Sequence, residues 1–447
     1  MLDISAPTLK QVAEILNTGF SGQDIGFSGV SIDSRTTKKN NLFIAIKGPN
    51  FDGHKFVKAA QAKGAAAALV SRRTQNLIPE LEVADTKHAL ISMAQAWRLV
   101  VDIKFAGITG SNGKTTVKEM LASILQLTGP GLKTRGNLNN DFGVPLTLLS
   151  LKPEHKWAVV EMGASGPGEI GKLAKLVQPF VALINNIAPA HIEGFGSIRE
   201  IAVTKGEIYK YLDKAGVAVM PYGSEFTDIW QEQSAVTNII TFGTAAKADI
   251  SVSEKNNQTR IQTPKGVIEL SLPVGGEHNR LNAAAATAIA LQFDVSLGQI
   301  KQGLEAVKAV NGRLKENIHK TGARVIDDTY NANPVSVAAA LKFLASFKGL
   351  KIFIFGDMGE LGSKAKDFHR QIGQLASELG VDEFLSLGEL SKFASLEFKG
   401  KSRHFSSMQE LIEYTTAKLK NDTTILVKGS RFMQTQRLIE SLLEESQ

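Results

Sequence analysis

The chain has 447 residues, no cysteine and a formal net charge of +7, with 43% hydrophobic and 21% charged residues. This length predicts about three domains, and the composition excludes a disordered chain, a disulfide-bonded scaffold and a thiolate nucleophile. Lys and Arg are scattered, aromatic residues make up only 7%, and no apolar run approaches the roughly 20 residues of a membrane span. We therefore expect a soluble, cytoplasmic protein that binds a small phosphorylated ligand rather than nucleic acid.

Residues 1–102 are predicted to form a small α/β domain. Strand or helix patterns occupy 9–16 (helix), 29–33 (strand), 42–46 (strand), 55–63 (helix) and 65–70 (strand). Polar segments follow two of the strands and contain Ser31, Arg35, Lys47 and Gly48. Loops at strand ends often bind ligands, but Gly, Pro, Asn and Asp are also the usual turn residues, and the residues alone favour plain turns.

A phosphate-binding loop is predicted after a short strand that begins at Lys104, with a helix continuing to Leu127. Its residues are Thr109, Gly110, Ser111, Asn112, Gly113, Lys114, Thr115 and Thr116. Free N–H groups at the helix start and the glycines suit an oxyanion, Lys114 adds positive charge, and Thr115 offers a hydroxyl to Mg²⁺. The usual first glycine is replaced by Ile108, so the spacing is the shorter Gly-x-x-Gly-Lys-Thr. A glycine turn with a solvated lysine is the alternative, but strand, loop and helix together favour a nucleoside triphosphate.

Residues 103–314 alternate strand and helix patterns, which predicts a mostly parallel sheet with ligands at the carboxyl ends of its strands. Glu161 ends a buried strand and could hold Mg²⁺ or cap the next helix. His191 follows the next strand, although a single loop histidine is more often an ordinary surface residue. Lys205 lies on a helix, where the residues alone favour a solvated lysine.

Two asparagine-rich segments in this region suggest a polar ligand. The loop at 134–145, which includes Asn137, suits a sugar or an amide, or a turn. Asn279 and Asn282 stand three apart before an alanine-rich helix, where they could face one base edge or cap the helix. Short alternating segments at 217–273 predict a small antiparallel excursion from the sheet.

Residues 315–447 are predicted to form a doubly wound domain. Strand patterns occupy 323–327, 351–355, 384–387 and 424–427, with helix-sized segments between them. Polar loops follow three of these strands, so they lie at the ligand-bearing edge of the sheet.

Taken together, these segments resemble the Mur ligases of peptidoglycan synthesis, and specifically their MurF type. The loop at 109–116 resembles the family's short phosphate loop, which folylpolyglutamate synthases share. The segments that select the MurF type are 136–140, 186–195, 327–333 and 356–362. The resemblance covers nearly the whole chain and implies an α/β fold of three domains. These are a UDP-substrate domain (1–102), a P-loop ATPase-like ATP domain (103–314) and a Rossmann-like domain for the incoming dipeptide (315–447).

The implied reaction is ATP-dependent amide formation. ATP phosphorylates the terminal carboxylate of UDP-N-acetylmuramoyl-tripeptide, and the amine of D-alanyl-D-alanine displaces phosphate from the acyl phosphate. Activation is needed because an unmodified carboxylate would have to expel oxide. The carboxylate and the γ-phosphate are both negative, so Lys114 and two Mg²⁺ ions would neutralise their repulsion.

The resemblance also implies residue roles. Thr115 and Glu161 match ligands of one magnesium, His191 matches a ligand of the second, and Lys205 matches the lysine that CO₂ carbamylates into an anionic metal ligand. Nucleotide contacts are implied for Asn279 and Asn282 (adenine), Asp328 (ribose) and Arg313 (phosphates). Substrate contacts are implied for Ser31, Arg35, Lys47 and Gly48 (UDP), Asn137 (muramoyl group), and Tyr330, Asn331 and Asp357 (dipeptide). Tyr330 stands where a related ligase type has lysine.

Other functions remain open at this point. A folate or other amino-acid ligase would use the same phosphate loop. The positive charge and the nucleotide loop would also fit a nucleic-acid-stimulated ATPase, and a nucleotide-gated binding protein would need no chemistry. We expect a monomer without stable membrane insertion.

Overall fold

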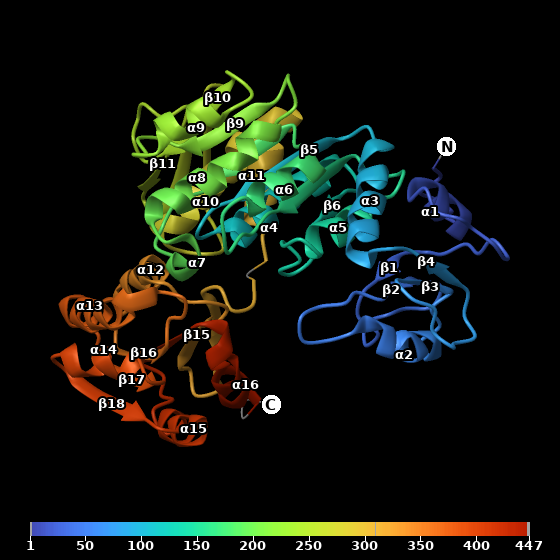
Figure 1. Ribbon diagram of the computed structural model, residues 1–447. Coiled ribbons are helices and arrows are strands. Elements are labelled where there is room, and N and C mark those ends of the chain that lie inside the picture. Colours follow the sequence, from blue (N-terminus) through green and yellow to red (C-terminus); the bar gives the residue numbers. More distant parts are fainter. Residues whose placement is uncertain (1, 309, 445–447) are drawn as a thin grey trace.

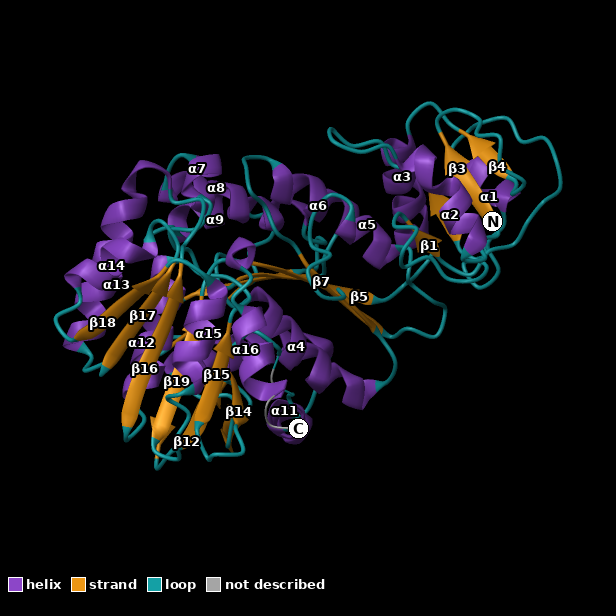
Figure 2. Cartoon of the chain, turned by 90° about the horizontal axis from the view of Figure 1, so that it is seen from below, coloured by secondary structure: helices purple, strands orange, loops and turns teal. Residues whose placement is uncertain are grey.

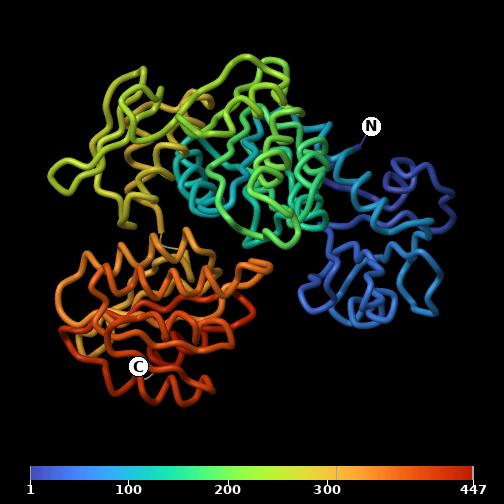
Figure 3. Tube along the Cα trace, turned by 60° about the vertical axis from the view of Figure 1, so that its left-hand side comes forward, coloured from blue at the N-terminus to red at the C-terminus, as the bar shows by residue number. Residues whose placement is uncertain are grey.

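The computed structural model describes residues 2–308 and 310–444, which form three sheets, each built from one stretch of the chain (Figure 1). The units that carry the first and third sheets lie on the same side of the central unit in both Figure 1 and Figure 3. Among the described residues, no helix combines the length and the apolar character that a membrane span requires.

The first sheet has four parallel strands in the order β1-β2-β3-β4. The strands are β1 (Val30–Ser31), β2 (Leu42–Ile44), β3 (Ala67–Val70) and β4 (Glu80–Glu82), and the helices are α1 (Leu9–Ile15) and α2 (Val57–Ala62). Thr8 and Gln11 form a capping box that starts α1. The predicted elements are present with shorter strands, whereas β4 was not predicted.

A long helix, α3 (Thr86–Leu99), joins this unit to the central sheet and was not predicted either. The Oγ1 of Thr86 donates to the carbonyl of Ala45, 3.0 Å away, on the N-terminal side. At the other end, Arg98 donates to the carbonyl of Val177 and lies 3.9 Å over the ring of Phe105. One hydrophobic core therefore runs from the N-terminal unit through α3 into the central sheet.

The central sheet has nine strands in the order β13-β12-β11-β10-β9-β8-β5-β7-β6. In chain order they are β5 (Lys104–Thr109), β6 (Leu132–Lys133), β7 (Trp157–Glu161), β8 (Val181–Ile184), β9 (Val217–Pro221), β10 (Ile239–Gly243), β11 (Ile250–Lys255), β12 (Gln258–Thr263) and β13 (Gly266–Leu270). Pairing is parallel from β6 to β11 and antiparallel from β11 to β13. The predicted antiparallel segments thus extend the same sheet instead of leaving it.

Helices cover both faces of this sheet. They are α4 (Lys114–Leu125), α5 (Gly143–Leu148), α6 (Glu169–Val177), α7 (Ile192–Phe195), α8 (Ile198–Gly206), α9 (Thr227–Gln233), α10 (Glu277–Ala290) and α11 (Leu297–Glu305). Alternate residues of β7 enter opposite cores, with Val160 on the α3 and α6 side and Val159 on the α4 and α10 side. A strand buried on both faces explains the continuous apolar runs in the sequence.

The third sheet has six strands in the order β14-β15-β19-β16-β17-β18, all parallel except β14. The strands are β14 (Lys315–Ile318), β15 (Arg324–Asp328), β16 (Leu350–Gly356), β17 (Glu383–Leu387), β18 (Lys401–Phe405) and β19 (Thr423–Lys428). The helices are α12 (Pro334–Ala345), α13 (Ala365–Glu378), α14 (Ser391–Glu397), α15 (Met408–Thr416) and α16 (Gln436–Glu444). Separate cores under α12 to α14 and under α15 and α16 confirm the doubly wound prediction (Figure 2).

Candidate active site

The loop between β5 and α4 is held by the end of the neighbouring strand β8. The N–H of Ser111 donates to the carbonyl of Asn186, 2.9 Å away, and the N–H of Asn112 donates to the Asn186 side chain at 2.8 Å. Gly113 has φ of +78°, and a Cβ there would collide with the side chains of Asn185 and Asn282. Glycine is therefore required at this position for both conformation and space.

Lys114 lies at the start of α4 with its side chain folded back over the loop. Its Nζ donates to the carbonyl of Gly110 at 2.6 Å and to that of Ser111 at 3.4 Å. Burial lowers the pKa of Lys114, while the charge of Glu161 opposes that shift. Among the described residues, the ammonium group thus hydrogen-bonds only to loop carbonyls, and a phosphate at this loop would offer it a stronger acceptor.

Glu161 at the end of β7 is surrounded by three side chains, two from α4 and one from the loop before α5. Its carboxylate accepts from Thr115 Oγ1 at 2.9 Å and from Asn139 Nδ2 at 2.8 Å, and Lys118 Nζ lies 3.5 Å away. The alternative that Glu161 caps the following helix is wrong, because α6 has Gly168 as its N-cap. The hydroxyl and carboxylate stand together as a pair of oxygen donors.

His191 contacts the C-terminal unit. Its Nδ1 contacts a carboxylate oxygen of Glu360, and both residues have a positive φ, 55° for His191 and 60° for Glu360. Left-handed backbone is uncommon for residues other than glycine and often marks functional sites. Burial lowers the pKa of His191, and the Glu360 charge opposes the shift.

Lys205 on α8 is buried, with only 3% of its surface exposed. Its Nζ lies 5.9 Å from the ring centroid of Phe195, and no carboxylate or carbonyl within residues 2–308 and 310–444 accepts a hydrogen bond from it. Burial and the nearby charge of Lys114 hold the pKa of Lys205 well below its usual value. A solvated lysine, which the residues alone favoured, is therefore not what the structure has.

Thr115 and Glu161 fit a magnesium site in which most ligands are substrate phosphates and water. No group of three or more His, Asp or Glu side chains gathers in the part of the chain that the structure describes. Mg²⁺ commonly binds one or two carboxylates together with substrate phosphates and water. The oxygens of Thr115 and Glu161 beside the phosphate loop match that donor set.

A second polar cluster lies at the start of α10, where it lines the same cavity as the loop residues 110–114. Asn282 accepts from Asn185 at 2.8 Å and donates to Asn279 at 3.3 Å, and Asn279 donates to the carbonyl of Gly275 at 2.8 Å. The capping alternative is wrong, because the N-cap of α10 is Gly276. His278, which was not predicted, lines the same wall, and burial lowers its pKa to about 4.

A third group of side chains comes from Arg313, just before β14, and from the C-terminal unit. Arg313 donates to Thr115 Oγ1 at 3.0 Å, and its guanidinium lies 4.3 Å from the ring centroid of Tyr330. Asp328 accepts from Lys428 Nζ at 2.6 Å, and burial raises the pKa of Asp328. Asp357 does not line the cavity, because its carboxylate accepts from the N–H of Leu390 and Ser391 and so caps α14.

One cavity of about 790 Å³ brings most of the predicted residues together. Its lining includes Gly110, Ser111, Asn112, Gly113, Lys114, Thr116, Asn137, Glu161, His191, Lys205, Asn279, Asn282, Arg313, Asp328, Tyr330 and Asn331. Thr109 and Thr115 are buried beside it. The predicted residues of the N-terminal unit, Ser31, Arg35, Lys47 and Gly48, do not line it, and Arg35 instead pairs with Asp33 at 2.7 Å.

Several residues of the site were missed in the sequence. They are Lys118, Asn139, Asn185, His278, Asn333, Glu360 and Lys428. His278 and Asn139 stood beside predicted residues, so their place in a polar segment was a usable signal. Glu360 lies in the segment 356–362 that resembles the MurF type, but its contact with His191, like that of Lys118 with Glu161, joins residues far apart in the chain and has no local signal.

Three models of one protein family match the chain in succession. The model described as Mur ligase family, catalytic domain, matches residues 26–100, the Mur ligase middle domain matches 108–290, and the Mur ligase, glutamate ligase domain, matches 312–431. Together they cover most of the chain.

Similar proteins match over nearly their full length. The UDP-N-acetylmuramoyl-tripeptide–D-alanyl-D-alanine ligases of Escherichia coli (strain K12) and Bacillus subtilis (strain 168) are 40% and 34% identical, each covering 98% of both chains. A crystal structure of MurF from Acinetobacter baumannii superposes with a TM-score of 0.89 at 37% identity, covering 98% of this chain and 99% of that one. MurF from Thermotoga maritima, solved in complex with ADP, has a TM-score of 0.80 at 28% identity, covering 93% and 97%.

Proposed function

Since this chain belongs to the Mur ligase family, we propose that it joins D-alanyl-D-alanine to UDP-N-acetylmuramoyl-tripeptide and converts ATP to ADP and phosphate. It is an ATP-dependent ligase of peptidoglycan precursor synthesis, as its relatives are named. The observation that carries this function is the single cavity in which the phosphate loop, the Thr115 and Glu161 pair, and Arg313 and Asp328 meet. ATP and an activated carboxylate need such a site, which a binding module would not.

The reaction has two steps. A carboxylate oxygen of the tripeptide attacks the γ-phosphorus and ADP leaves, which gives an acyl phosphate. The amine of the dipeptide then attacks the acyl carbon, phosphate leaves with the electrons of the broken C–O bond, and the nitrogen releases a proton. Because both partners of the first step are anions, the site must supply positive charge around them.

This chain's own residues supply part of that charge. Lys114 would turn from the loop carbonyls to the β and γ phosphates, and Arg313 lies on the opposite side, next to Thr115. Thr115 and Glu161 would hold one Mg²⁺ and His191 would hold the second. The ions, when bound, neutralise charge on the phosphates. Asn279 and Asn282 would contact adenine, and Asp328 the ribose.

We assign Lys205 as the site of a carbamate formed with CO₂. A lysine reacts with CO₂ only as the neutral amine, and burial beside Lys114 favours that form. Carbamylation would convert this amine, which has no acidic partner among the described residues, into an anionic ligand for the second metal. Among the described residues, no hydrogen bond or ion pair of Lys205 is found, and its Nζ lies 5.9 Å from the ring centroid of Phe195.

Substrate binding is divided among the units. The N-terminal domain (1–102) would hold UDP through Ser31, Arg35, Lys47 and Gly48, and Asn137 would meet the muramoyl group. The C-terminal domain (315–447) would bind the dipeptide near Tyr330 and Asn331, and the central domain (103–314) ATP. Asp357 acts instead as a helix cap. The enzyme would work as a monomer in the cytoplasm.

The direct test measures ADP formation with purified protein. We expect turnover only when ATP, Mg²⁺, UDP-N-acetylmuramoyl-tripeptide and D-alanyl-D-alanine are all present, with the amide product detected by mass spectrometry. Turnover with glutamate and a pteroate acceptor would instead identify a folate ligase. ATP hydrolysis stimulated by DNA or RNA would contradict both.

The carbamate has its own test. Lys205→Ala should lose most activity and regain part of it when short carboxylic acids are added, because these can occupy the place of the carbamate. ¹³C NMR of the parent protein with ¹³CO₂ should show a carbamate carbon that the variant lacks. A Lys205→Ala protein as active as the parent would disprove this role.

A further inference from the structure

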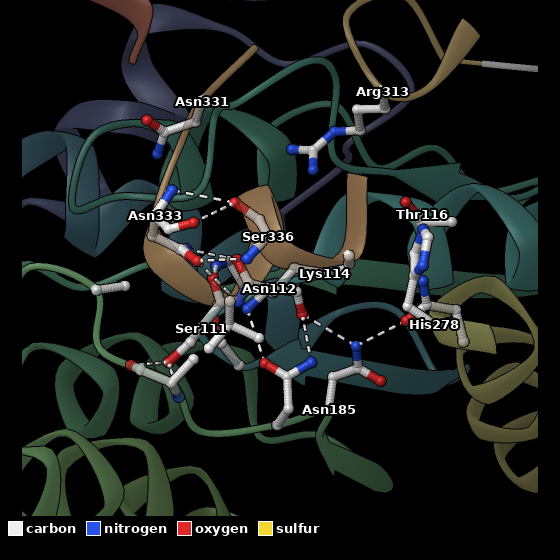
Figure 4. Close-up of a pocket in the computed structure, with 18 of the residues that line it drawn as sticks. Ser111, Asn112, Lys114, Thr116, Asn185, His278, Arg313, Asn331, Asn333 and Ser336 are labelled. Carbon is white, nitrogen blue, oxygen red and sulfur yellow. Dashed lines mark hydrogen bonds between the residues drawn. The ribbon is translucent and has the colours of Figure 1, made fainter. Parts of the chain in front are cut away.

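Two asparagines face each other across the boundary between the central and C-terminal units. Asn333 Nδ2 donates to Asn112 Oδ1 at 2.6 Å, and Asn112 Nδ2 donates to Asn333 Oδ1 at 3.4 Å (Figure 4). The residues are 221 positions apart in the chain. Each amide is both donor and acceptor to the other, so the contact is reciprocal and uncharged.

The backbone of Asn112 is fixed to the central sheet. Its N–H donates to Asn186 Oδ1 at 2.8 Å, and its carbonyl accepts from the side chains of Asn185 at 2.9 Å and Asn186 at 3.1 Å. The residues that follow β8 hold the main chain of Asn112, and its side chain extends away from the sheet. Asn333 is its only hydrogen-bonding partner within the described residues.

Asn333 is fixed just as firmly to the C-terminal unit. It is the N-cap of α12, where its Oδ1 accepts from the N–H of Ser336 at 2.9 Å and its own N–H donates to Ser336 Oγ at 3.0 Å. Only 7% of Asn333 is exposed. Because the main chain of Asn112 and the side chain of Asn333 are both held in place, their hydrogen bonds form only when the loop and α12 have a defined relative position.

We propose that Asn112 and Asn333 form a clasp that holds the helix beside the dipeptide site against the phosphate loop. Because the clasp joins the loop that would hold the nucleotide phosphates to α12, its loss lets the two units separate and weakens binding of the dipeptide. This role rests on the proposed function for the identity of the two ligands. Both are positioning residues, because neither needs to touch the reacting atoms.

The test is a double-mutant cycle of Asn112→Ala and Asn333→Ser. Serine caps helices about as well as asparagine, so Asn333→Ser removes the clasp and keeps the N-cap. Two neutral hydrogen bonds predict a KM for D-alanyl-D-alanine that rises on the order of tenfold in each single variant. The double variant should be no worse than either single one, and the KM for UDP-N-acetylmuramoyl-tripeptide should stay at the parent value.

X-ray scattering with the analogue AMP-PNP and Mg²⁺ gives a readout that does not depend on chemistry. The parent should become more compact with nucleotide, and each variant should remain extended. Ser407→Ala is the matched control, since it removes a cap hydroxyl, 3.3 Å from the N–H of Glu410, far from the cavity. It should lower stability without changing either KM.

The possible results separate the clasp from the function. The clasp is contradicted if the increases in KM for D-alanyl-D-alanine multiply in the double variant. It is also contradicted if the variants become as compact as the parent when AMP-PNP and Mg²⁺ are added. A parent that forms no amide with D-alanyl-D-alanine would overturn the proposed function, while the scattering experiment would still decide on the clasp.

Discussion

Replacing Lys118 with methionine removes the cation nearest to Glu161. Lys118 has no exposed surface, and its Nζ lies 3.2 Å from the carbonyl oxygen of Gly136, 3.3 Å from Glu119 and 3.5 Å from Glu161. Methionine keeps most of the side-chain volume, so the change is mainly one of charge. Glu161, only 2% exposed, would then keep its charge without that partner.

The structure sets the size of the expected loss. Removing one partner of a buried ion pair costs about 3–5 kcal/mol. Glu161 retains hydrogen bonds from Thr115 and Asn139, so we expect the lower end, about 3 kcal/mol of unfolding free energy. In a unit of about 200 residues this corresponds to a melting temperature lower by roughly 6–12 °C. Mg²⁺ should reduce the difference, because it supplies positive charge to the same carboxylate.

Denaturant and thermal unfolding, each with and without Mg²⁺, measure this effect. Lys133→Met is the matched control: Lys133 also pairs with Glu119, but its side chain is 36% exposed. Exposed pairs contribute only about 0–1 kcal/mol, so this variant should unfold close to the parent. If Lys118→Met unfolds like the parent, or Lys133→Met loses as much, Lys118 does not compensate the charge of Glu161.

Three further variants test other parts of the structure. Tyr209→Phe removes a buried hydroxyl that donates to the carbonyl of Val219 at 2.6 Å and accepts from the N–H of Ile184 at 3.2 Å. The loss should lower the unfolding free energy by about 1–3 kcal/mol. Tyr211 is exposed, so the control Tyr211→Phe should have no effect. Burial lowers the pKa of His278 from 6.5 to about 4. The unfolded chain therefore binds an extra proton between these values, and stability falls as pH decreases through that window. His278→Gln should flatten that fall in unfolding measured from pH 7 to pH 4. Glu360→Gln should raise the Mg²⁺ concentration for half-maximal turnover by about tenfold, because the carboxylate orients His191, and an unchanged requirement would contradict that contact.

The sequence predicted the elements whose signals are local. The phosphate loop was found because strand, glycines, Lys114 and helix follow one another directly. Strand β18 was missed because it is an edge strand, exposed over Lys401 to His404, and so lacks an apolar pattern. Burial on both faces made β7 easy to recognise.

Site residues were predictable when they ended a strand and unpredictable when their partner came from another unit. Glu161 follows a buried run, and the rule for parallel sheets then locates it. Asn333 was expected only as part of a polar loop, since its contact with Asn112 depends on how two domains meet. Periodicity contains no information about that arrangement.

Four lysines of the site, three of them buried and Lys114 half-buried, differ in what compensates their charge. Lys118 and Lys428 each have a carboxylate within 3.5 Å and 2.6 Å, respectively, and Lys114 has the loop carbonyls. Lys205 has neither, among the residues described, and its pKa is held well below the usual value. A buried ammonium without an acceptor is unfavourable, so burial shifts Lys205 toward the neutral amine. The neutral amine is the form of a lysine that reacts with CO₂, and this is why we assign the proposed carbamate to Lys205.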